Sequence, residues 1–149
     1  MGEVYRLAKE FKRKYPMTIG WRLKKNSAII EKHLNPGEVV TYVFVGQKRM
    51  PFYSIFNTAV VAVTNRRLLI GRDRVVIGYF MDSVTPDLFN DFKVKSGLVW
   101  GKVFIDTIKE FIAISHLDKA ALAEIETKVT TFMMTEKKKY GLKSGGKHE

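Results

Sequence analysis

The sequence predicts a mainly β domain that also contains α-helices, and three observations lead to this fold class. The central segment 57–80 holds three short apolar runs, rich in Val and Ile, that are separated by polar turn residues. Segment 98–105 shows the two-residue alternation of a strand. Segments 4–15 and 117–133, near the two ends of the chain, repeat their apolar residues at helical spacing instead.

The central segment is predicted to form three strands of an antiparallel meander. Thr58–Thr64 is apolar and β-branched throughout, which is typical of a strand that is covered on both faces or lies in a sandwich core. Asn65 and Arg66 break the run, and Asn tolerates the positive φ of a tight hairpin turn. Arg67–Ile70 is then the second strand. Gly71–Arg74 is the next expected break, and Val75–Phe80 is the third strand.

Two motifs in this part of the chain resemble a known family. Val63-Thr64-Asn65-Arg66-Arg67-Leu68-Leu69-Ile70 looks like the strand–turn–strand signature of bacterial pleckstrin-homology-like (PH-like) domains. Leu34-Asn35-Pro36-Gly37-Glu38 resembles the L-x-P-G-E segment that leads into the first strand of that family. The resemblance extends roughly from Leu34 to Met134. It implies a seven-stranded, partly open barrel that is plugged by a C-terminal helix, and it implies no catalysis.

The chain is expected to have three parts. Residues 1–33 form an N-terminal helical extension of two helices, which is too small to bury a core of its own. Residues 34–135 form the barrel with its C-terminal helix, and we expect this part to fold without the extension. Residues 136–149 form a charged, flexible tail. The apolar stripe of the first helix either packs on the barrel, which we favour because the stripe is short, or lies on a membrane surface.

The other elements follow from apolar alternation and capping signals. The remaining strands are expected at Glu38–Gln47, Phe92–Lys95, Leu98–Ile105 and Lys109–Ser115. Gly101, in the middle of a strand, predicts a bulge or kink. The last helix is expected at Leu117–Met133, with Asp118 as its N-cap and Leu117 and Leu122 as a hydrophobic staple.

Composition narrows the possible environments and partners. The 149 residues carry a net charge of +11 and no Cys, and residues 1–33 contribute +6 through nine Lys or Arg against three Glu. Such an excess suits an anionic partner. No apolar stretch approaches the ~20 residues of a membrane span, and the first residues lack a signal-peptide core. We therefore expect a cytoplasmic protein, with peripheral membrane contact as an option.

The sequence contains no recognisable catalytic, metal or cofactor motif. The three His residues, at 33, 116 and 148, have no partners at metal-site spacing, and no glycine-rich phosphate loop is present. No helix-turn-helix pattern accompanies the basic helices. We predict a protein that is not an enzyme, with no cofactor, no metal and no small-molecule substrate. Nucleic acid is the less favoured of the anionic partners that its charge allows.

A meander places the loops after the first, third and fifth strands at one end of the barrel. We take the basic and aromatic residues of these loops as the candidate site for an anion or a protein partner: Lys48, Arg49, Phe52, Tyr53, Arg72, Arg74 and Lys95. The opposite end is expected to hold Asp82, Asp87 and Asp106.

The first functional hypothesis is protein–protein interaction or self-association through exposed strands and the apolar loop 48–56. The alternative is binding of anionic lipid headgroups or a membrane surface through the basic barrel mouth and the first helix. The residues Asn57, Thr58 and Ala59 count against the alternative, because phosphoinositide-binding PH domains, which the arrangement resembles, have further basic residues there.

Overall fold

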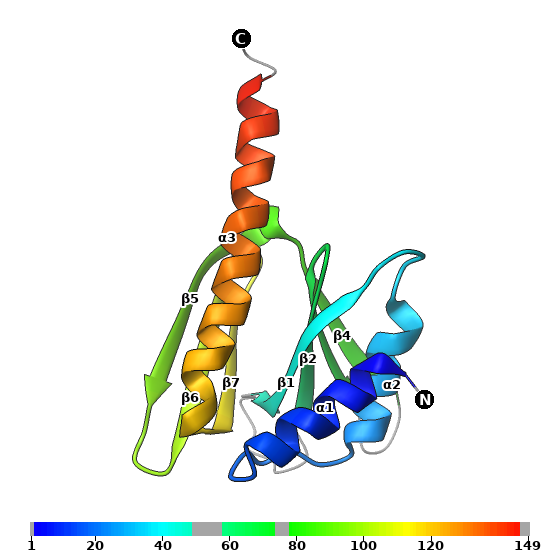
Figure 1. The fold of residues 1–149 in the computed structure, drawn as a ribbon, viewed down its shortest axis with the longest axis vertical. Helices are drawn as coiled ribbons and strands as arrows, with labels where there is room; N and C mark the ends of the chain where they lie inside the picture. The colour runs from blue at the N-terminus through cyan, green and yellow to red at the C-terminus, as the bar shows by residue number, and fades with distance from the viewer. Residues whose placement is uncertain (1, 49–57, 74–77, 147–149) are drawn as a thin grey trace.

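The computed structural model describes residues 2–48, 58–73 and 78–146, with side chains described as far as residue 136. Three α-helices, seven strands and two short 3-10 turns follow one another along the chain (Figure 1). In chain order the elements are α1 (Glu3–Lys14), α2 (Leu23–His33), β1 (Val40–Lys48), β2 (Thr58–Thr64), β3 (Leu68–Asp73), β4 (Tyr79–Val84), η1 (Pro86–Leu88), β5 (Phe89–Ser96), β6 (Trp100–Thr107), β7 (Phe111–Asp118), η2 (Lys119–Ala121) and α3 (Leu122–Gly146).

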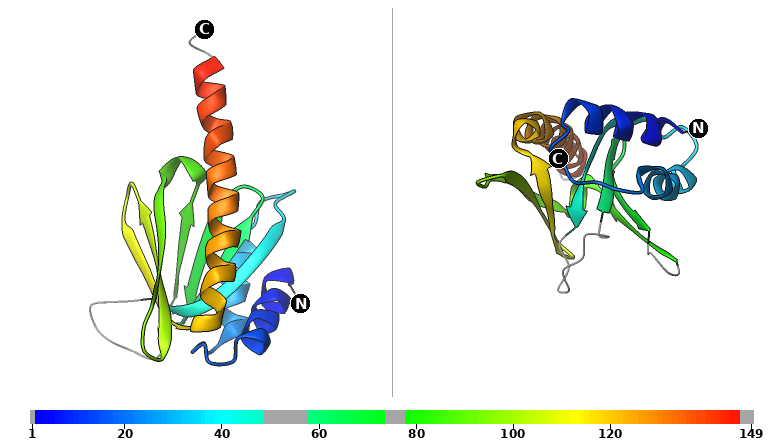
Figure 2. Two further views of the ribbon diagram at one scale, coloured as in Figure 1. Left: turned by 60° about the vertical axis from the view of Figure 1, so that its left-hand side comes forward. Right: turned by 90° about the horizontal axis from the view of Figure 1, so that it is seen from below.

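The seven strands form one antiparallel sheet in the order β4-β3-β2-β1-β7-β6-β5. The sheet curls into a half-barrel, α3 packs on it, and two helices precede it, so the predicted fold class is confirmed (Figures 1 and 2). The two central strands β1 and β7 pair over only two positions, Gln47 with Ser115 and Lys48 with Ile114. Gln47 and Lys48 are the last two residues of β1, so the rest of β1 is not paired with β7.

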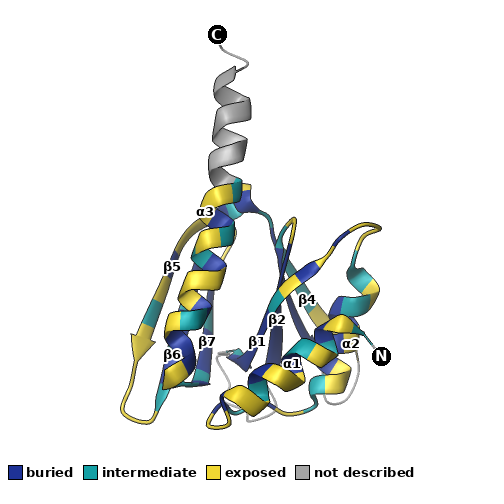
Figure 3. Ribbon diagram, viewed as in Figure 1, coloured by how far each residue is buried: buried dark blue, intermediate teal, exposed yellow. Residues whose placement is uncertain are grey.

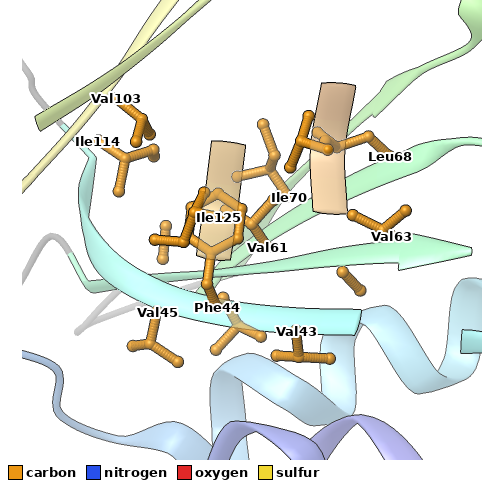
Figure 4. Close-up of a cluster of buried hydrophobic side chains, with 14 of the residues drawn as sticks. Val43, Phe44, Val45, Val61, Val63, Leu68, Ile70, Val103, Ile114 and Ile125 are labelled. Carbon is orange, nitrogen blue, oxygen red and sulfur yellow. The ribbon is translucent and has the colours of Figure 1, made fainter. Parts of the chain in front are cut away.

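Strand alternation separates the side chains of β1 to β4 into an inner and an outer set. Phe44, Val61 and Ile70 occupy paired positions on neighbouring strands and lie toward Ile125 of α3 (Figure 4). Val43 and Val45 point the other way, toward the N-terminal helices (Figure 4). The named residues of both sets are buried. β2 is buried at every position because both of its faces are covered, whereas the edge strand β4 is only partly buried.

The N-terminal helices provide the cover for the outer face. Val4, Ala8 and Phe11 of α1 and Ile30 of α2 are buried in the same hydrophobic cluster as the barrel strands. Figure 3 shows buried and exposed residues alternating along α1, as in an amphipathic helix. The packing interpretation of the apolar stripe is therefore confirmed. Because α1 and α2 belong to the core, the structure argues against our expectation that the barrel folds without them.

The central meander differs from the prediction after β2. The bounds of β2 are those predicted, but β3 continues to Asp73, so the break expected at Gly71 was wrong. A Cβ atom at Gly71 would lie 2.9 Å from Cγ1 of Ile30 and 3.0 Å from the carbonyl oxygen of Asn26. This glycine is thus needed for the close approach of α2, not for a turn. The third strand, expected at 75–80, is found at Tyr79–Val84 instead, and residues 74–77 lie outside the described residues.

The elements after β4 occur in the predicted order with shifted bounds. Gly101 forms the predicted irregularity, because the register between β6 and β7 shifts there, and a Cβ atom at this position would lie 2.5 Å from Cδ1 of Leu122. The carboxylate of Asp118 accepts a hydrogen bond from the Ala120 N–H, at 3.0 Å, and so caps η2 in front of α3. The helix α3 continues to Gly146, well beyond its predicted end at 133, and its backbone includes most of the expected tail.

Candidate functional site

The two family-like motifs meet in a buried ion pair. The Glu38 side chain is fully buried and accepts hydrogen bonds from Nε and Nη2 of Arg67, each at 3.0 Å. It also accepts from the Thr64 hydroxyl at 2.6 Å and from the Asn35 N–H at 3.0 Å. Burial by itself would raise the pKa of Glu38, but these hydrogen bonds and the charge of Arg67 lower it to about 2. The Glu38–Arg67 pair and its hydrogen bonds join the segment before β1 to the β2–β3 hairpin, and they stabilise the fold.

The structure brings only part of the predicted basic mouth together. Lys48 and Arg72 lie on the inner face, where Nζ of Lys48 is 2.7 Å from Oδ2 of Asp82 and the Arg72 guanidinium is 4.4 Å from the ring centroid of Phe80. Lys95 is exposed on β5, whose inward neighbour Val94 packs against the core. The other four candidates lie outside the described residues: Arg49, Phe52, Tyr53 and Arg74.

The expected separation of charge between the two ends of the barrel was wrong for Asp82. We expected it at the acidic end, but the shift of β4 places it within the strand, opposite Ile70, where it pairs with Lys48. The ends of β1, β3 and β5 do lie at one end of the sheet, as the meander requires (Figure 1). At this end, the two described cations of the inner face already have neighbours, which are Asp82 for Lys48 and the ring of Phe80 for Arg72.

A different surface emerges on the outside of β5, β6 and β7. Strand register arranges its side chains in three rows across the strands, and we call this surface the three-row face. The basic row is Lys95 and Lys102, the middle row is Lys93, Phe104 and Ala113, and the acidic row is Asp91, Asp106 and Phe111. The rings of Phe104 and Phe111 stack with their centroids 5.6 Å apart, although 64% of Phe111 is exposed.

The lower border of the three-row face is set by the segment between α1 and α2. The Trp100 indole N–H donates to the carbonyl oxygen of Met17 at 2.8 Å, and the Ile19 N–H donates to the carbonyl oxygen of His116 at 2.9 Å. The pKa of His116 is lowered, mainly by burial and also by the nearby positive charge of Lys102.

The sequence showed the alternation of side chains along β6. The three rows of the three-row face, however, also depend on how β6 pairs with β5 and β7.

A second unusual surface lies at the end of the sheet where β5 turns into β6. Three exposed apolar side chains from two segments define it, and we call it the basal tip: Met17, Leu98 and Val99. Leu98 is 94% exposed. Nζ of Lys119 donates to the carbonyl oxygens of Gly97 and Leu98, so a cation sits directly beside this tip.

The described part of the chain contains neither a cluster of metal-binding side chains nor a membrane-spanning helix. Residues 2–48, 58–73 and 78–146 contain no group of three or more His, Asp or Glu side chains that could hold a metal ion. Among the helices of these residues, none combines the length and the apolar character of a membrane-spanning segment. The candidate surfaces for function are the three-row face and the basal tip.

The chain was compared with family models, solved structures and curated proteins. Residues 34–131 match a family model described as "Bacterial PH domain". Among solved structures, the crystal structure of a pleckstrin homology domain from Shewanella amazonensis SB2B is similar, with a TM-score of 0.49 and 13% identity. That match covers 75% of this chain and 88% of the other. No curated protein matches the sequence significantly.

Proposed function

Because the chain belongs to the bacterial PH domain family, whose members are binding modules and typically non-catalytic, we propose that it is an assembly module. It self-associates through the three-row face. The observation that carries this proposal is the uncovered state of that face. The helices α1 and α2 cover the outer side of β1 to β4, whereas no helix of the described residues covers the outer side of β5 to β7.

The composition of the face supports protein contact. The exposed ring of Phe111, stacked on the half-buried ring of Phe104, is typical of a protein interface, where aromatic residues are enriched and charged residues such as Lys and Asp are depleted at the centre. The edge strand β5 carries Lys93 and Lys95, and lysines on an edge oppose strand addition. Association therefore uses the face of these strands, not their edge.

Replacing Phe111 by Ser tests the proposal. We expect the wild-type protein to gain mass with concentration in sedimentation equilibrium, and Phe111→Ser to weaken this association about tenfold, because the exposed ring is lost from the interface. Val39→Ser is the matched control, since Val39 is 58% exposed but lies outside the three-row face. A wild-type mass of one chain at every concentration would refute self-association.

The basal tip favours a second candidate function, docking on an anionic membrane. An apolar side chain as exposed as Leu98, at the tip of a hairpin, is suited to enter the headgroup region of a bilayer. Lys95, at the end of β5, and Lys119, which donates to the carbonyl oxygens of the hairpin, are exposed beside this tip. Lysines close to a bilayer surface gain from anionic lipids.

Vesicle flotation tests this second candidate. We expect binding to vesicles of phosphatidylcholine and phosphatidylserine in equal parts, weak binding to pure phosphatidylcholine, and a loss of about tenfold in the double variant Leu98→Ser with Val99→Ser. The matched control is Val39→Ser with Ile108→Ser, which removes two exposed apolar side chains away from the basal tip. If both double variants bind as the wild type does, the basal tip is not a membrane contact.

A further inference from the structure

We infer that the assembly is a closed two-fold dimer, in which the three-row faces of two copies pack with their strands antiparallel. The basic row of each copy then lies against the acidic row of the other. This inference rests on the proposed self-association and adds to it the partner, which is a second copy of this chain, and the register.

The charge pattern within one chain is unfavourable on its own. Lys95 and Lys102 are directly opposed on neighbouring strands, and so are Asp91 and Asp106. Like charges directly opposite in a sheet are destabilising. Asp91 has one nearby cation, Nζ of Lys93 at 4.0 Å, but both side chains are largely exposed and such contacts contribute little. Each row thus gains from a facing row of opposite charge.

The spacing of the rows makes the face complementary to itself. On β6 the residues Lys102, Phe104 and Asp106 point outward in turn, so the basic and acidic rows are four residues apart, or about 13 Å. A two-fold axis that crosses the strands at Phe104 reverses β6 over its symmetry mate. Lys102 then faces the Asp106 position of the second copy. The middle row faces itself, with Phe104 against Phe104 and, on the edge strand, Lys93 against Lys93.

The alternative symmetry is disfavoured by the same charges. With the strands parallel about an axis along β6, Lys102 would face Lys102 and Asp106 would face Asp106, and like charges that face each other across an interface are unfavourable. An isologous contact of the antiparallel kind uses the same patch on both copies and closes at two chains. The charges therefore select a dimer of one orientation, and salt should weaken it.

Single and paired charge reversals test the register. In the Lys102→Asp variant, an Asp at 102 faces Asp106 of the second copy. In the Asp106→Lys variant, a Lys at 106 faces Lys102 of the second copy. Each substitution should therefore weaken the dimer more than tenfold in sedimentation equilibrium. The double variant Lys102→Asp with Asp106→Lys restores opposite charges and should recover the wild-type dissociation constant to within a few-fold. Lys24→Asp, on the exposed surface of α2, is the control for the same change in net charge. Thermal melts followed by circular dichroism establish that each variant is folded.

The outcomes separate this inference from the proposed function. If the wild type is a single chain at every concentration, self-association fails and the inference fails with it. If the wild type is a dimer but the double variant stays as weak as the single ones, or the single reversals have no effect, the antiparallel register is wrong while self-association stands. A limiting mass above two chains would contradict the closed dimer alone.

Discussion

Deletion of residues 1–33 should abolish the cooperative unfolding transition of this domain. The deletion removes six buried apolar side chains from the core: Val4, Ala8, Phe11, Tyr15, Ile29 and Ile30. It also exposes the outer set of β1 to β3 to water. At about 1.5–3 kcal/mol for each large side chain, the loss is on the order of 10 kcal/mol, comparable with the whole stability of a typical domain. Urea unfolding followed by circular dichroism measures it.

Truncation after Glu136 is the control for this deletion. It shortens α3 only where the helix projects beyond the sheet (Figure 1) and keeps the buried residues Ile125, Val129 and Met133. We expect this variant to keep a single sharp transition. If the chain without residues 1–33 also kept one, residues 34–135 would be an independent folding unit, as the sequence alone suggested.

Glu38→Ala should lower the free energy of unfolding by about 3–5 kcal/mol near neutral pH. The substitution leaves the Arg67 guanidinium, whose side chain is only 15% exposed, without its carboxylate. It also removes the acceptor for the Thr64 hydroxyl and the Asn35 N–H. Glu3→Ala is the control, because Glu3 pairs with Arg6 in an exposed position and its loss should leave the urea midpoint nearly unchanged. An equal effect of both substitutions would show that the buried pair does not stabilise the fold.

The same pair makes stability depend on pH in a defined direction. The pKa of Glu38 is lowered from 4.5 to about 2 in the folded chain, so the unfolded chain takes up this proton first as the pH falls. The stabilisation is therefore fully present above pH 4.5 and is lost between pH 4.5 and about 2, by about 3 kcal/mol. The Glu38→Gln variant, which has no carboxylate to protonate, should lose correspondingly less stability over this range.

The sequence predicted the strands best where local signals agreed. β2 was predicted to the residue because a β-branched run ends at an Asn-containing turn. The break at Gly71 was misplaced because a glycine in a strand and a glycine in a turn look alike in sequence. The apolar sequence of β2 also indicated that both faces of this strand are covered. The sequence did not reveal that α1 and α2 cover the outer face, because that depends on contacts between segments far apart in the chain.

The candidate surfaces were less predictable than the fold. Lys95 was selected from its position in a loop at the barrel mouth, whereas alternation places it on the outside of β5, beside Lys102. The rows of the three-row face could not be derived beforehand, because the register shift at Gly101 and the start of β5 at Phe89 decide which residues are neighbours. Such a register is a property of paired strands, not of either strand alone.

The brief contact between β1 and β7 divides the half-barrel into two leaves. One leaf is β4-β3-β2-β1 and the other is β7-β6-β5, and only two paired positions join them. The helix α3 spans the division, since Ile125 lies beside Phe44 of the first leaf (Figure 4) and Leu122 packs over Gly101 of the second. Few backbone hydrogen bonds therefore join the leaves, and the continuous apolar core, with α3 packed across both, holds them together instead.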